Sequence, residues 1–131
     1  MRLSVVIDSV DPDALVPFWA AALRYRYVEQ EGLGAFRVLV PDRGEPPGPV
    51  LILQHVPEAR PAGKNRLHLD VHPSDVPAHV ARLAELGALL QGPPVTELLD
   101  SLGIWWQVLA DPEGNTLCVV ADPGHAPPGN S

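Results

Sequence analysis

A histidine and an aspartate stand two residues apart in one short segment of the sequence. His68 and Asp70 fall within residues 67–71, which we predict to be a strand. Side chains two residues apart share one face of a strand, so these two would point away from the flanking leucines. Such a pair can perform acid–base chemistry, with the carboxylate orienting the imidazole. The alternative is structural: a hydrogen-bonded histidine, and a carboxylate bonded to loop backbone or to a nearby arginine.

Two adjacent tryptophans and one cysteine are further candidates. Trp105 and Trp106 lie in a predicted strand and so face opposite sides. One can pack beneath a helix, while the other can line a cleft for a planar or apolar ligand. Cys118 is the only cysteine, which excludes an internal disulfide and a zinc ribbon. Its thiol is either a small apolar filler of the core or a functional group.

The elements that must position these residues follow one another twice in the same order. Asp11 is predicted to cap a helix that runs to about Leu23, and Ser74 or Asp75 to cap a second helix that Gly87 closes in a left-handed conformation. Apolar and β-branched runs predict strands at residues 3–8, 25–29, 36–40, 50–54, 67–71, 89–90, 104–110 and 116–120.

This repeated βαβββ order indicates an internal duplication. The two helix caps are 64 residues apart, and the same offset pairs Ser4 with His68 and Gln54 with Cys118. We therefore predict an α+β fold of two βαβββ modules in tandem, which form curved mixed sheets around one cleft.

Proline and glycine mark the connections between these elements. The chain has 16 prolines and 11 glycines, many of them at residues 41–49 and in the C-terminal tail. We expect one domain over residues 1–123, with module one at about 1–60 and module two at about 64–123. Residues 124–131 are expected to be a flexible tail.

Composition excludes several classes of function. The 131 residues carry 9 Lys and Arg against 16 Asp and Glu, a formal net charge of −7, without the basic stripe of a nucleic-acid-binding protein. No apolar run approaches the ~18 residues of a membrane span. The first apolar run is cut by Asp8, unlike a signal peptide. We expect a cytoplasmic protein that binds neither nucleic acid nor membrane.

Several segments carry a family resemblance. Ala110–Cys118 resembles the closing hairpin of the vicinal oxygen chelate superfamily, which includes glyoxalase I, extradiol dioxygenases and bleomycin-resistance proteins. Arg66–Val71 is similar to its second-module opening strand. Lys64–Asp70 and Asp111–Asn115 look most like the actinobacterial glyoxalase-like subgroup. These motifs are specific for the fold and weak for the reaction.

The resemblance implies a divalent metal held by up to four side chains, two from each module. The positions that match the usual ligands hold Ser4, Gln54, His68 and Cys118. Only His68 is a usual ligand in its expected place. Gln54 offers a neutral oxygen, and Cys118 puts a soft sulfur where a hard carboxylate is usual. We therefore expect no resident cofactor, with a divalent metal (Zn, Mn, Ni or Fe) on His68, Gln54 and Cys118 as the alternative.

The missing carboxylate ligands favour a protein that binds a small molecule, such as an aromatic one, in the inter-module cleft without the usual catalytic metal. Its ligand contacts would come from Gln54, His68, Trp105, Trp106 and Cys118. The alternative is a metal- or His-dependent lyase, isomerase or dioxygenase with His68 and Asp70 as catalytic pair. A third hypothesis is a regulatory or structural partner domain that has lost the site. The resemblance also implies a homodimer, and whether the chain is an enzyme stays open.

Overall fold

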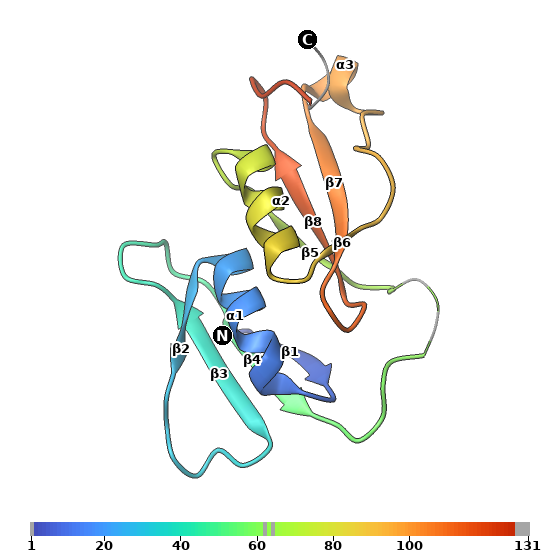
Figure 1. The fold of residues 1–131 in the computed structure, drawn as a ribbon. Helices are drawn as coiled ribbons and strands as arrows, with labels where there is room; N and C mark the ends of the chain where they lie inside the picture. The colour runs from blue at the N-terminus through green and yellow to red at the C-terminus, as the bar shows by residue number, and fades with distance from the viewer. Residues whose placement is uncertain (1, 62, 64, 128–131) are drawn as a thin grey trace. The chain divides into compact units, whose positions relative to one another are not determined.

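Two compact units make up the chain. The computed structural model describes residues 2–61, 63 and 65–127. Met1–Pro61 form the first unit and Ala62–Ser131 the second. Each unit contains one four-stranded sheet. In each unit a helix packs against the sheet (Figure 1).

The first unit runs strand, helix and three strands. These are β1 (Ser4–Ser9), α1 (Pro12–Leu23), β2 (Tyr25–Val28), β3 (Phe36–Pro41) and β4 (Val50–His55). Their order in the sheet is β1-β4-β3-β2, in which β1 pairs with β4 in parallel and the other neighbours are antiparallel.

The second unit repeats this connectivity. It contains β5 (Leu69–Val71), α2 (Val76–Glu85), β6 (Leu89–Leu90), α3 (Leu99–Leu102), β7 (Trp105–Ala110) and β8 (Thr116–Ala121). The sheet order is β5-β8-β7-β6, again with a parallel first pair. The predicted α+β fold of two βαβββ modules with mixed sheets is therefore confirmed, and α3 is an addition that the sequence pattern did not predict.

Local signals explain where α1 begins and what it buries. The carboxylate of Asp11 accepts a hydrogen bond from the amide of Ala14 at 3.4 Å, and Pro12 occupies the first helical position. The helix continues through Pro17 and ends at Arg24, which has a left-handed backbone with φ 55°. The side chains that it buries recur at helical spacing: Leu15, Phe18, Trp19 and Ala22.

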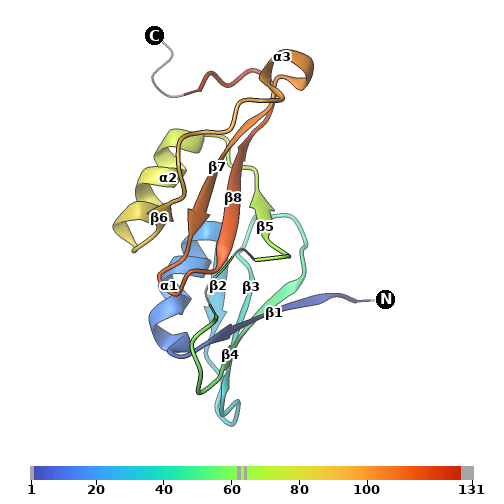
Figure 2. The same cartoon turned by 90° about the vertical axis from the view of Figure 1, so that its right-hand side faces the viewer.

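The second sheet has two chemically different faces. Leu117 and Val119 of β8 are fully buried, as are Val76 and Leu83 of α2, so this face lies against the helix. Figure 2 shows α2 to one side of β5, β7 and β8. The alternate residues of the three strands point the other way, namely Asp70, Cys118, Val108 and Trp106. We call these four, together with His68, the histidine face.

Strand β5 is shorter than the sequence predicts. It begins at Leu69, not at Leu67, so His68 lies directly before the strand. Leu67 is 89% exposed and does not pack beneath a helix. The predicted start of this strand is therefore wrong. His68 and Asp70 nevertheless point to the same side, and their side chains lie 3.2 Å apart.

One further fold prediction is confirmed, and others concern residues that the structure does not describe. Gly87 closes α2 with φ 103°, as predicted. Of the predicted tail, residues 128–131 lie outside the described residues, and Lys64 of the subgroup motif does too. Among the helices of the described residues, none has the length and apolar character that crossing a membrane requires.

Candidate functional site

Three side chains of the second unit bring different chemistries to one place on the histidine face. His68 Nε2 lies 3.2 Å from Asp70 Oδ1, and Cys118 offers the third atom; all three potential ligand atoms lie within 4.8 Å of one another. The side chains of His68 and Asp70 are 40% and 49% exposed, whereas Cys118 is 6% exposed. The cluster therefore has a buried thiol beside an accessible imidazole and carboxylate.

Strand pairing explains why these residues meet. Asp70 on β5 stands directly opposite Cys118 on the parallel neighbour β8. His68 precedes Asp70 by two residues and so points to the same side. Sequence periodicity therefore provides the His68–Asp70 pair, and the β5–β8 register adds Cys118.

Asn65 fixes the segment that precedes His68. Its Oδ1 accepts two hydrogen bonds from Thr116, one from the backbone amide at 2.8 Å and one from the hydroxyl at 2.7 Å. Thr116 is the first residue of β8. The Asn65 side chain thus connects the loop before β5 to the start of β8. This contact lies ahead of the paired residues of β5, which begin at Leu69, and it holds His68 near Cys118.

The two tryptophans separate as their adjacency requires. Trp105 is 1% exposed on the helix-facing side, and its indole N–H donates to the carbonyl of His125 at 2.7 Å. Trp106 is half-buried on the histidine face, opposite Val120 on β8. It is a diagonal neighbour of Cys118, a relation that corresponds to about 7–8 Å in a sheet. Trp106 therefore lies on the same face of the sheet as the cluster, and Trp105 lies on the opposite face.

The first unit does not bring together Ser4 and Gln54, the two residues at the positions that the resemblance matches to metal ligands. Ser4 pairs with Val50, while Gln54 pairs with Asp8 at the other end of the same two strands. Four residues along a strand correspond to about 13 Å. The offset of 64 residues therefore does not relate both β1 to β5 and β4 to β8 in the observed registers. Ser4 and Gln54 are too far apart to bind one ion.

The donor set of the cluster decides which metal it fits. Imidazole, thiolate and carboxylate are all ligands of Zn²⁺, whereas a thiolate is a poor partner for Mg²⁺ or Mn²⁺. The usual hard-ion centre of the superfamily needs carboxylates that are missing from the predicted positions. The residues therefore fit zinc and do not fit a hard divalent ion.

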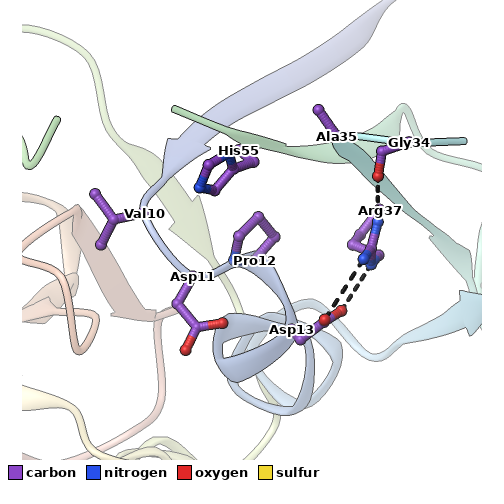
Figure 3. A pocket seen from close by; sticks show the side chains of 8 residues that line it. All are labelled: Val10, Asp11, Pro12, Asp13, Gly34, Ala35, Arg37 and His55. Carbon is purple, nitrogen blue, oxygen red and sulfur yellow. Dashed lines mark hydrogen bonds and ion pairs between the residues drawn. The ribbon is translucent and has the colours of Figure 1, made fainter. Parts of the chain in front are cut away.

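A surface pocket of about 370 Å³ lies in the first unit, at the start of α1. Figure 3 shows Arg37 reaching toward Asp13 and the carbonyl of Gly34. Arg37 Nε donates to Asp13 at 2.6 Å, and this hydrogen bond holds the pKa of Asp13 below its usual value. Arg37 Nη1 donates to the Gly34 carbonyl at 2.8 Å. The guanidinium group of Arg37 thus already binds acceptors within the protein, and we assign this pocket no ligand.

Sequence reasoning missed the contribution of Asn65. An asparagine after a Pro- and Gly-containing loop is ordinarily a turn residue. Its contact with Thr116 spans 51 residues, so no local pattern identifies it.

Solved structures with similar folds come from several bacteria. A glyoxalase/bleomycin resistance protein/dioxygenase family enzyme from Burkholderia phytofirmans PsJN has TM-score 0.71 and 20% identity, covering 92% of this chain and 98% of that one. A glyoxalase family protein from Bacillus cereus has TM-score 0.70 and 17% identity, covering 95% of each chain. A fosfomycin resistance protein from Listeria monocytogenes has TM-score 0.70 and 9% identity, covering 95% and 94%. At these identities the likeness concerns the fold.

The family itself is shown by the sequence. No curated protein matches the chain at a significant level. The family model described as a glyoxalase-like domain matches residues 4–120, which include both sheets except Ala121 and contain the His68–Asp70–Cys118 cluster. With this match over most of its length, the chain belongs to the glyoxalase-like domain family.

Proposed function

We propose that this protein binds a small aromatic molecule with vicinal oxygens on the histidine face of its second unit. The observation that carries the proposal is the His68–Asp70 pair, whose polar atoms lie 3.2 Å apart and remain accessible on the face that also carries half-buried Trp106. In this proposal, ligand binding does not require the hard metal ion that is usual in the superfamily. The predicted position of the ligand in a cleft between the modules stays a prediction.

The chemistry of the face supports such a ligand. Asp70 can accept hydrogen bonds from two neighbouring hydroxyls, and His68 can donate or accept one. Trp106 and Val108 add aromatic and aliphatic surface on β7. A planar ring with adjacent oxygens can therefore meet polar groups at one edge and apolar groups along its plane.

Catechol is a suitable probe, with its dimethyl ether as the matched control. The three tryptophans give separate indole N–H signals in a ¹⁵N-correlated NMR spectrum. We expect catechol to shift the Trp106 signal while the signals of buried Trp19 and Trp105 stay in place. The dimethyl ether lacks both hydroxyl donors and should cause a much smaller shift.

Two histidine variants make this test specific. His68→Ala should abolish the catechol shift. His79→Ala should leave it unchanged, because His79 lies on α2, which packs on the other face of the sheet. An equal response in both variants, or no response of Trp106 in the parent protein, contradicts the proposal.

The second candidate function is catalysis, which the same His68–Asp70 geometry favours. A carboxylate that orients an imidazole is the arrangement of general acid–base catalysis. The enzyme would be a lyase, isomerase or dioxygenase of the vicinal oxygen chelate type. Incubation with vicinal-oxygen compounds distinguishes the two functions: recovery of unchanged compound supports binding alone, and conversion that His68→Ala abolishes supports the enzyme.

We also propose a homodimer and membership of the actinobacterial subgroup, as the sequence resemblance implies, and a cytoplasmic location, which the single cysteine favours. Light scattering tests the first of these. A mass that stays at the 14.1 kDa of one chain at high protein concentration contradicts the homodimer.

A further inference from the structure

We propose that the second unit alone holds a zinc-class cation on His68, Asp70 and Cys118. Asp70 is a donor that the sequence-based ligand set did not contain, and it takes the place of Gln54. The proposal does not rest on the aromatic ligand, because the metal is bound by protein atoms only.

The cluster is close to the dimensions of a zinc site. Zinc binds nitrogen and oxygen at about 2.0–2.2 Å and sulfur at about 2.3 Å, which places neighbouring donors of a tetrahedral site about 3.3–3.6 Å apart. His68 Nε2 and Asp70 Oδ1 are already 3.2 Å apart. The sulfur of Cys118 lies within 4.8 Å of a ligand atom of each of the other two residues, so the thiol has to approach them when an ion binds.

The charges and softness of the donors select the kind of ion. A thiolate and a carboxylate together balance a dication, and the neutral imidazole completes the set. The thiolate favours zinc and other thiophilic ions over Mg²⁺ and Mn²⁺. The site proposed here therefore differs from a hard-ion centre in chemistry as well as in composition.

Exposure leaves room for entry and for a fourth ligand. His68 and Asp70 are about half exposed, so an ion can reach them from solvent, while Cys118 forms the buried floor. Three protein ligands with one position open to water are typical of catalytic zinc sites. Asn65 and Thr116 hold the loop before His68, which limits the movement needed to bind.

The first experiment uses zinc and cobalt alone as probes. The full chain is stripped with EDTA, dialysed against Zn²⁺, and its metal content measured by mass spectrometry. We expect one zinc per chain, and millimolar Mg²⁺ should not displace it. Co²⁺ in the same site should show the visible bands of tetrahedral cobalt and a sulfur-to-cobalt charge-transfer band in the near ultraviolet.

Single substitutions then assign the donors. Asp70→Asn and His68→Ala should each weaken zinc affinity by at least about 10–100-fold, the loss that even an outer-sphere partner can cause. Cys118→Ser should also remove the charge-transfer band. Circular dichroism of each variant confirms that it is folded.

The same unit offers a matched control pair. His72 and Asp122 lie 2.9 Å apart with similar exposure, but they are not part of the three-residue donor group. His72→Ala and Asp122→Asn should retain full zinc affinity. Gln54→Ala should as well, because the proposed site takes no donor from the first unit.

Four outcomes would overturn the proposal. They are the absence of stoichiometric zinc, unchanged affinity in Asp70→Asn, a loss in Gln54→Ala equal to that in His68→Ala, and a cobalt spectrum without the sulfur band. None of these results bears on catechol binding, which is measured on metal-stripped protein, so the two proposals fail separately.

Discussion

Asn65 anchors the segment that leads to His68. His68 lies outside β5, so the backbone ladder does not hold it. The two hydrogen bonds that Thr116 donates to Asn65 Oδ1 do this instead. A single amide side chain thereby connects the loop to the strand that carries Cys118.

Replacing Asn65 should destabilise both the fold and the cluster. Asn65→Ala leaves a partly buried amide and hydroxyl of Thr116 without their acceptor, which should cost about 1–3 kcal/mol of unfolding free energy. Chemical denaturation measures this loss, and the NMR signals of His68 should broaden or shift. Asn65→Asp keeps the acceptor oxygen and should recover most of the stability; if it is as damaging as alanine, the acceptor role is wrong.

The site was predictable from sequence only as far as local periodicity reaches. The shared face of His68 and Asp70 follows from the two-residue repeat of extended backbone. The approach of Cys118 depends on the β5–β8 register, and the separation of Ser4 from Gln54 depends on the β1–β4 register. Such registers join distant segments, and a repeat offset cannot determine them.

At the scale of elements, the capping signals were the most informative part of the sequence. Asp11 and Asp75 cap α1 and α2 through their carboxylates, and Gly87 ends α2. The start of β5 could not be predicted from such a signal. The amide of Thr116, the first residue of β8, donates to the side chain of Asn65 and not to the backbone of an extended β5. The four-residue helix α3 is too short to leave a periodic signal.

The exit of α1 contains a residue that is poorly suited to its backbone. Arg24 is the only described non-glycine residue with positive φ, at 55°. This conformation costs an ordinary residue about 1–2 kcal/mol. The amide of Arg24 bonds to Ala20 and its carbonyl accepts from Asp42, so the surrounding structure enforces the turn.

Arg24→Gly should therefore stabilise the protein. The strain that glycine removes exceeds the chain entropy that it adds to the unfolded state, which leaves a net gain of about 0.5–1 kcal/mol. Thermal and urea unfolding measure the gain. Arg24→Ala removes the same exposed side chain but keeps the strain, so an equal gain in the alanine variant would show that the backbone is not the cause.

The ion pair between Asp13 and Arg37 at the start of α1 should make the unfolding free energy of the protein depend on pH. The hydrogen bond from Arg37 lowers the pKa of Asp13 below its ordinary value. A carboxyl with a lowered native pKa adds stability above its unfolded pKa of about 4, and this contribution disappears as pH falls through the native pKa. Asp13→Asn should therefore destabilise the protein at pH 7 and have little effect near pH 2.

A double-mutant cycle with Arg37→Gln isolates this ion pair. In the Arg37→Gln background, urea unfolding at pH 7 and pH 2 should show the same effect of Asp13→Asn. A pH-dependent effect that persists without Arg37 would assign the acid sensitivity to another group. Both side chains are at the surface, so added salt should weaken the coupling.

At the scale of the whole molecule, two units of one connectivity carry different chemistry. The sheet orders and the parallel first pairs are the same in both. In the first unit, the pair Val6 and Ile52 lies next to Asp8 and Gln54, and Val6 is 50% exposed. Only the second unit places a histidine, a carboxylate and a thiol together among the described residues. The duplicated fold thus places a histidine, a carboxylate and a thiol together in one half, where the other half has Val6, Asp8 and Gln54.

Zinc binding at this cluster should raise the stability of the chain as a thermodynamic consequence. At free zinc 100 times its Kd, a native-state ligand adds about 2.7 kcal/mol to the unfolding free energy. Calorimetry of the full chain should show a higher Tm for the transition that includes the second unit, and EDTA should reverse the shift. His72→Ala should retain the zinc-dependent shift and Cys118→Ser should lose it. A shift of equal size in Cys118→Ser would mean that zinc stabilises the chain elsewhere, for which the net charge of −7 offers many acidic groups.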